Sequence, residues 1–215
     1  MSLKKILEEV GNGKQTPGAG TVSGIAAALS IALEATLIII MKNRRQESIC
    51  SVCIEDMKCC LDIIRAKVNS FITEDSQNFQ RFWDLKKKHC ERDEDLIPCI
   101  TEPIKISFLL IEIVRYGIFF IEYGSEQTRG DANTAYYLAV ASVKSLEKIC
   151  LENMNTFAKD QQRMKDYRTK LLEIKSLLDN LNIDNLQGNE TITDLLKKDM
   201  DNDQSECCTF KKLEI

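Results

Sequence analysis

The sequence predicts an all-α protein, a single helical-bundle domain with a central buried small-residue helix. Apolar residues recur at three- and four-residue spacings over long stretches, and no stretch alternates apolar and polar residues between turns as a strand does. Only three prolines and nine glycines interrupt the 215 residues, a length that suits one domain with a substantial core. We place this domain at residues 1–185 and interpret the polar, acidic residues 186–215 as a weakly ordered tail.

The first helices differ in character. Residues 3–10 predict a short helix, whereas residues 22–42 are apolar all round, which is typical of a helix that is buried on every side. Small residues recur at every fourth position along this second helix, at Gly20, Gly24, Ala28 and Ala32. Such spacing is typical of closely packed helix pairs, and it favours contact with the same helix of a second subunit.

The same segment is nearly long enough to cross a membrane. Glu34 lies at its middle, where a charge in hydrocarbon is costly, and the later helices are amphipathic. A small membrane or assembly protein is therefore the less favoured alternative, and we expect no membrane partner.

Three longer helices follow. We expect a helix over residues 46–88, a charged irregular link over 89–95, and a helix over 101–122 with Pro103 in its first turn, where proline is tolerated. After a polar turn at 123–130, Asp131 or Asn133 is expected to cap a helix that reaches residue 154 and continues to 181.

Charge and cysteine content limit the functional classes. A formal net charge of −4 argues against nucleic acid as the main partner. Nine cysteines, an odd number without a secretory signal, predict free thiols in a cytoplasmic protein. The cluster Cys50, Cys53, Cys59 and Cys60 raises a zinc alternative, but the only histidine, His89, is distant in sequence. A buried apolar stripe explains the cluster better, so we predict no metal.

A turn rich in proline and glycine precedes the buried helix, at residues 16–21. Gly18 and Gly20 allow backbone N–H groups to approach a ligand, and a helix N-terminus attracts anions. The structural alternative is a glycine-rich start to a buried helix, because the pattern matches neither dinucleotide nor P-loop motifs. Three other polar groups are candidates, each with an equally simple structural role: Lys42 with Arg44 and Arg45, Glu74 with Asp75, and Arg129 with Asp131.

Three sequence blocks resemble, in the same order, the C-terminal domain of the formiminotransferase-cyclodeaminase family, which also contains free-standing methenyltetrahydrofolate cyclohydrolases. The family's PGGGS turn reads here Pro17–Thr21, and the RRQ segment of some members reads Arg44-Arg45-Gln46. Its I-D-x-D-x-x-x-F segment reads Ile72–Phe79, and its G-N-x-x-x-x-S-D turn reads Gly124–Asp131. Pro103 also matches a family proline, and the similarity extends over about residues 3–180.

The resemblance implies a helical homodimer, or higher homo-oligomer, that binds a reduced folate between subunits without a metal. In the cyclodeaminase, 5-formiminotetrahydrofolate closes to 5,10-methenyltetrahydrofolate and releases ammonia; in the cyclohydrolase, water opens the methenyl bridge. Both reactions need proton transfer by a positioned carboxyl group of raised pKa. A separate formiminotransferase or dehydrogenase is an implied partner.

Site residues follow from the matched blocks. Asp75 is the implied general acid/base, and Asp131 a second carboxylate that orients the pterin or the first acid. The turn at Gly18, Gly20 and Thr21 is expected to bind substrate by hydrogen bonds. Cationic side chains are expected to bind the folate's glutamate carboxylates: Lys42, Arg44, Arg45 and, as a weaker candidate, Arg129. About 30 Å of helix separates the turn from the arginines, which predicts a site completed by a neighbouring chain.

Four positions depart from the family pattern. Thr73 replaces the first aspartate, Ala19 replaces the middle glycine, and Ile39 and Met41 stand where members often carry polar residues. These departures support an alternative in which the chain is a non-catalytic scaffold that retains folate binding, or an enzyme with a changed substrate.

Overall fold

The computed structural model describes residues 3–13, 16–43 and 51–183, with the side chains of 51–53 excluded. This part of the chain is helical and contains no strand, so the predicted all-α class is confirmed. The predicted tail, Arg44 and Arg45 lie outside the described residues. The elements are α1 (Leu3–Gly11), α2 (Ala19–Asn43), α3 (Ser51–Lys87), α4 (Asp93–Leu96), α5 (Pro98–Tyr123), the 3₁₀ turn η1 (Glu126–Thr128), α6 (Arg129–Phe157) and α7 (Lys165–Asn180).

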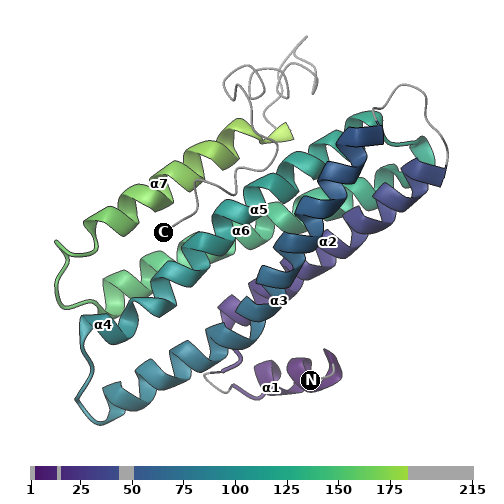
Figure 1. Cartoon of the computed structure of the whole chain (residues 1–215). Helices are drawn as coiled ribbons and strands as arrows, with labels where there is room; N and C mark the ends of the chain where they lie inside the picture. The colour runs from purple at the N-terminus through teal and green to yellow at the C-terminus, as the bar shows by residue number, and fades with distance from the viewer. Residues whose placement is uncertain (1–2, 14–15, 44–50, 184–215) are drawn as a thin grey trace.

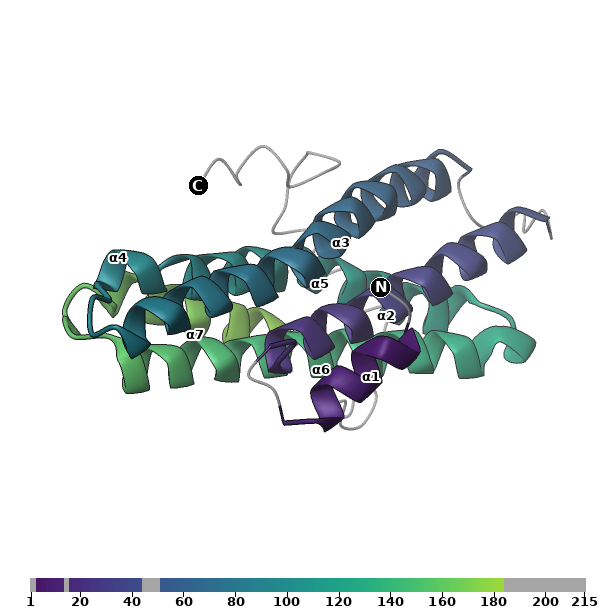
Figure 2. The same ribbon diagram turned by 90° about the horizontal axis from the view of Figure 1, so that it is seen from below.

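Four long helices, α2, α3, α5 and α6, form the bundle (Figure 1). Helix α2 packs between α3 and α6, while α5 packs against α6 and α3, and α7 covers α5 and α6. Helix α1 lies outside the four long helices (Figure 2). The core is formed by leucine, isoleucine and aromatic side chains, among them Leu110, Ile113, Phe120 and Tyr136.

Helices α2 and α6 are antiparallel and close together. The Ser23 hydroxyl donates to the Ser145 hydroxyl at 2.8 Å, and the Ser30 hydroxyl donates to the Ala135 carbonyl oxygen at 2.7 Å. Moving forward along α2 therefore means moving backward along α6. The first turn of α2 lies beside the second half of α6, and the last turn of α2 lies toward the start of α6.

The first half of the small-residue face of α2 packs within the chain. A Cβ atom on Gly24 would lie 2.8 Å from Cγ1 of Ile72, so Gly20 and Gly24 face α3 of the same chain, whereas Ala32 is exposed. The prediction that α2 is buried on every side is wrong, because Val22, Leu29 and Ile39 are 44%, 52% and 58% exposed. These three residues define the exposed apolar stripe of α2.

Helix α2 is long and apolar enough to cross a membrane by length and composition. Glu34, at its middle, is nevertheless fully buried inside the bundle, and its carboxyl oxygens have no hydrogen-bond partner among the described residues. Burial raises the pKa of Glu34 well above its usual value. The folded protein therefore favours the protonated, neutral carboxyl group at this position.

Replacing Glu34 with Gln should change how the stability of the protein depends on pH. In the unfolded chain Glu34 loses its proton once the pH exceeds the ordinary pKa of glutamate, whereas the folded chain retains the proton to higher pH. The free energy of unfolding of the wild type therefore declines as pH rises from the unfolded-state pKa to the folded-state pKa. The glutamine variant lacks this loss, and its advantage should grow by up to about 1.4 kcal/mol per pH unit. Urea denaturation over a pH series measures the difference. Parallel pH profiles for the two proteins would contradict the assignment.

The connections differ from the sequence-based expectations. The link after α3 contains the short helix α4, and Pro98 rather than Pro103 occupies the start of α5; Pro103 lies inside the helix. Helix α6 begins at Arg129, so Asp131 lies in its first turn and the predicted cap by Asp131 or Asn133 is wrong.

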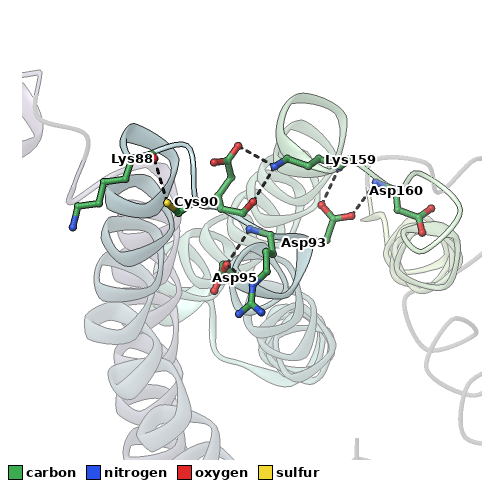
Figure 3. Close-up of polar contacts among 8 residues, drawn as sticks. Lys88, Cys90, Asp93, Asp95, Lys159 and Asp160 are labelled. Carbon is green, nitrogen blue, oxygen red and sulfur yellow. Dashed lines mark hydrogen bonds and ion pairs between the residues drawn. The ribbon is translucent and has the colours of Figure 1, made fainter.

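The expected continuous helix to residue 181 is also wrong, because the chain breaks between α6 and α7. The Asp93 carboxylate accepts the backbone N–H groups of Lys159 and Asp160, both at 2.9 Å (Figure 3). The Asp160 carboxylate accepts those of Gln162 and Arg163. These bonds replace the intrahelical bonds that the break removes.

Candidate functional site

The first turn of α2 holds the carboxylate of Asp75, which projects from α3. The Thr21 hydroxyl donates to Oδ2 of Asp75 at 3.0 Å, and the Thr21 backbone also donates a hydrogen bond to this carboxylate. A Cβ atom on Gly20 would lie only 2.3 Å from Oδ1 of Asp75. The carboxylate therefore occupies the space that a side chain at residue 20 would need. The anion predicted at this helix N-terminus is supplied by the protein itself.

Two opposing effects set the protonation of Asp75. Burial raises its pKa above the usual value, and the hydrogen bonds from Thr21 oppose this increase without cancelling it. The carboxyl group is thus held by donors that fix its position while its environment favours proton uptake. This combination suits a group that accepts and returns a proton.

A cavity of about 460 Å³ adjoins Asp75. Gly18 and the first two residues of α2, Ala19 and Gly20, form one edge. Helix α6 forms the opposite wall with polar side chains that recur on one helical face: Ser145, Lys148, Glu152 and Asn153. Sequence analysis missed these four residues, although polar side chains at this spacing within an apolar helix are the signal that identifies them.

An aromatic cluster lies behind the cavity. Phe79, which lines the cavity, stacks on Trp83 with a 6.0 Å centroid distance and an interplanar angle of 17°. Phe157 meets both rings edge-on from the end of α6. The cavity therefore offers a flat, rigid ring beside the carboxylate, a surface suited to a planar heterocycle.

The thiol of Cys99 also lines the cavity, but it stays protonated near neutral pH. Burial, with the nearby charge of Asp75, raises the pKa of Cys99 to about 12. The same causes raise the pKa of Cys150, which is fully buried. Neither thiol ionises near neutral pH, so neither serves as a nucleophile.

The structure divides the predicted site residues into two groups. Gly18, Gly20, Thr21 and Asp75 meet at the start of α2. Lys42, 22 residues beyond Gly20, lies about 33 Å away along α2 and forms an ion pair with Glu55. Arg129 and Asp131 begin α6, and Asp131 is 14 residues, or about 21 Å, from the cavity residue Ser145. Within one chain, these cations and Asp131 do not reach Asp75.

The positions that depart from the family pattern are also separated. Thr73 is exposed on α3 and does not line the Asp75 cavity, whereas Ala19 does. Ile39 is exposed, and Met41 is buried in the core. Among the described residues, no group of three or more histidine, cysteine, aspartate or glutamate side chains is arranged to hold a metal ion.

Comparisons with known proteins agree with this geometry. The sequence profile described as formiminotransferase-cyclodeaminase matches residues 2–173. Among solved structures, the fold is similar to that of formiminotetrahydrofolate cyclodeaminase from Thermotoga maritima, with a TM-score of 0.76 and 17% sequence identity over 92% of this chain and 94% of that chain. No curated protein sequence matches the chain.

Proposed function

Because the chain belongs to the formiminotransferase-cyclodeaminase family, we propose that it is a folate one-carbon enzyme that converts 5-formiminotetrahydrofolate to 5,10-methenyltetrahydrofolate and ammonia. The observation that carries this proposal is the Asp75 carboxyl group, held at the start of α2 by Thr21 and facing a cavity with an aromatic wall. Its raised pKa suits proton transfer at nitrogen. We place this activity in the cytoplasm.

Asp75 performs both proton transfers in the proposed reaction. The formimino nitrogen enters the reaction protonated, as an amidine is near neutral pH. The N10 atom attacks the formimino carbon, the carbon–nitrogen π electrons move to the formimino nitrogen to give an amino group, and the Asp75 carboxylate accepts the N10 proton as the N10–carbon bond forms. The same carboxyl group then donates that proton to the amino group of the tetrahedral intermediate. The carbon–nitrogen bond to this group breaks, ammonia departs, and the methenyl bridge remains. No redox change occurs, and the proton taken from N10 leaves with the ammonia.

The alternative is methenyltetrahydrofolate cyclohydrolase, which uses the same carboxyl group. In that reaction Asp75 accepts a proton from water as the water oxygen attacks the methenyl carbon. It then returns the proton to N5 as the N5–carbon bond breaks, and the hydroxyl proton is released to solvent as the formyl C=O bond forms, which leaves 10-formyltetrahydrofolate. A separate formiminotransferase or dehydrogenase supplies the folate substrate in these two cases.

One assay separates these functions. Purified full-length protein is mixed with 5-formiminotetrahydrofolate or with 5,10-methenyltetrahydrofolate, and the near-ultraviolet absorbance of the methenyl form is followed. Growth of this absorbance with release of ammonia supports the cyclodeaminase. Its decay faster than in buffer supports the cyclohydrolase. Folate binding without either change would identify a non-catalytic scaffold and overturn the proposed activity.

We also propose that the working unit is a homodimer formed through the exposed apolar stripe of α2. Val22, Leu29 and Ile39 are widely exposed, although they lie on a helix whose other faces are packed. Two copies of α2 that cross in opposite directions bring the far end of one helix toward the turn of the other. The ends that carry Lys42, Arg129 and Asp131 then approach the Asp75 cavity of the partner subunit.

Leu29→Glu should convert the proposed dimer to a monomer and lower turnover, because a charge at the centre of the interface loses its hydration. Sedimentation equilibrium measures the molecular mass. Leu172→Glu is the matched control, since Leu172 is 67% exposed on α7, away from α2. The interface assignment fails if the wild type sediments as a monomer or if Leu29→Glu remains a dimer.

A further inference from the structure

A buried asparagine on α6 has a hydrogen-bonding atom that faces the Asp75 cavity. Asn153 lines this cavity and is only 8% exposed. Its Nδ2 atom donates to the backbone carbonyl oxygen of Cys99, on α5, at 3.2 Å. A backbone carbonyl oxygen is only an acceptor, so the nitrogen of the amide is the atom that must face Cys99. The Oδ1 atom of Asn153 is therefore turned away from Cys99.

This Oδ1 atom is an acceptor without a donor. No described residue donates a hydrogen bond to it, yet it is not sealed from solvent as the carboxyl oxygens of Glu34 are. The cavity that Asn153 lines gives this access. Buried polar atoms are almost always hydrogen-bonded in folded proteins. A free acceptor on a buried side chain at a cavity therefore indicates a donor on the ligand.

Asn153 lies at the same end of the cavity as Asp75. Burial, together with the charge of Asp75, raises the pKa of Cys99 and of Cys150, so both cysteines lie near this carboxylate. Asn153 is bonded to the main chain of Cys99 and follows Cys150 by three residues, almost one turn of α6. The free acceptor and the proposed proton carrier therefore face the same part of a ligand.

The other polar side chains of the cavity are less suited to this task. The hydroxyl groups of Thr16 and Ser145 already take part in hydrogen bonds with described residues. Lys148 and Glu152 line the cavity but are exposed. Lys148 carries only donors, so Glu152 is the competing acceptor among these four, and water solvates its carboxylate.

If the proposed function holds, the formimino nitrogen is the part of the substrate that fits this acceptor. The nitrogen carries two protons in the amidinium group of the substrate, two in the amino group of the tetrahedral intermediate, and three in the departing ammonia. It therefore offers an N–H group to Asn153 at every stage, while Asp75 returns the proton taken from N10. In the cyclohydrolase reaction the corresponding atom ends as a formyl oxygen, which has no proton to donate.

We propose that Asn153 is the acceptor for the nitrogen that leaves as ammonia, and that it selects deamination over hydrolysis at the Asp75 site; this role rests on the proposed function. Oδ1 accepts a hydrogen bond from the formimino nitrogen and holds it toward Asp75. The bond from Nδ2 to Cys99 fixes the amide in the required orientation. A formyl oxygen at the same place sets two acceptors against each other, which disfavours the cyclohydrolase product.

The test uses ammonium as the probe of this acceptor. Initial rates of methenyl formation from 5-formiminotetrahydrofolate by the full-length protein are measured with ammonium chloride or tetramethylammonium chloride at fixed ionic strength. Ammonium should inhibit the wild type, whereas tetramethylammonium has the charge but no N–H group and should not. Asn153→Leu should raise the ammonium inhibition constant roughly three- to tenfold and lower kcat roughly ten- to hundredfold, as expected for the loss of one hydrogen bond. Asn153→Asp keeps an acceptor oxygen and should retain the inhibition.

Two controls separate this role from a structural one. Tetrahydrofolate, which lacks the formimino group, should bind equally to the wild type and Asn153→Leu. Binding is measured by quenching of Trp83, the only tryptophan, which stacks on the cavity residue Phe79. A merely structural role, exerted through the bond to Cys99, would weaken this binding as well. Asn155→Ala removes an exposed amide from the same helix outside the cavity and should behave as the wild type does.

Three results overturn the acceptor role. Ammonium and tetramethylammonium inhibit the wild type equally, or Asn153→Leu keeps the wild-type inhibition constant, or the inhibition is lost only in Glu152→Gln. If Asn153→Leu does not fold, Asn153→Ala gives the same measurement with a smaller side chain.

These outcomes also separate the acceptor role from the proposed function. If the wild type forms the methenyl product and ammonia but one of the three results is obtained, only the acceptor role fails. If the wild type does not convert 5-formiminotetrahydrofolate, the proposed function fails and the acceptor role fails with it.

Discussion

Replacing Asp75 with Asn should lower kcat by about 10²–10⁴-fold, because the amide cannot accept and return a proton. The substitution preserves the size of the side chain and removes only its charge and its proton. Thr21 can still donate to the remaining carbonyl oxygen, so the packing of α3 on α2 is retained. Thermal unfolding followed by circular dichroism should therefore show a folded protein. An unchanged rate would remove Asp75 from the proposed mechanism.

The pH dependence of the reaction gives a second test of the role of Asp75 as the proton acceptor. The carboxylate accepts a proton first, so kcat/KM should fall as pH decreases through the Asp75 pKa. Burial raises this pKa, so the fall begins at higher pH than for an ordinary aspartic acid. Thr21→Val removes a hydrogen bond to the charged form and should move the fall to still higher pH. Thr21→Ser keeps the hydroxyl group and should leave the profile in place.

The helical class and the residues at the start of α2 were predictable from the sequence. Apolar periodicity identifies amphipathic helices directly, and the glycines of a turn before a buried helix indicate a close approach. The sequence could not identify what approaches. Gly20 makes room for the carboxylate of Asp75, 55 residues later in the chain, and this contact depends on the packing of α3 against α2.

The errors have the same origin. The small-residue face of α2 predicts a close helix neighbour, but spacing alone does not distinguish α3 of the same chain from a second copy. The break between α6 and α7 depends on Asp93, which lies in a different connection and supplies the acceptors for Lys159 and Asp160. Such contacts between distant segments have no local signal in the sequence.

The cavity wall formed by α6 was missed for a related reason. Lys148 and Glu152 are separated by one helical turn, a spacing that on an exposed helix face predicts only a surface pair. They become part of the site because α6 runs antiparallel to α2, which brings this turn opposite Gly18 and Gly20. The matched family blocks contain the carboxylate but do not contain this wall.

Gly20→Ala should reduce turnover about 10²-fold while leaving most of the protein folded. The reason for the lower turnover is that the alanine side chain displaces the Asp75 carboxylate, and a displacement of about 1 Å at a reacting group has an effect of this size. The added Cβ atom would lie 2.3 Å from Oδ1 and 2.6 Å from Cγ of Asp75, so the carboxylate must move away from Thr21. Alanine is a better helix former than glycine by about 1 kcal/mol, which partly offsets the cost of overpacking. The loss should therefore be larger in activity than in stability.

Gly24→Ala is the matched control, one turn further along the same face of α2. Its Cβ atom would lie 2.8 Å from Cγ1 of Ile72 and 3.2 Å from Phe71, both apolar neighbours outside the Asp75 cavity. It should therefore lower the urea midpoint without changing kcat of the folded enzyme. The two variants crowd the same helix interface, and only Gly20→Ala displaces the proposed proton carrier. Equal losses of kcat in both variants would mean that Gly20 acts through general packing rather than through the position of Asp75.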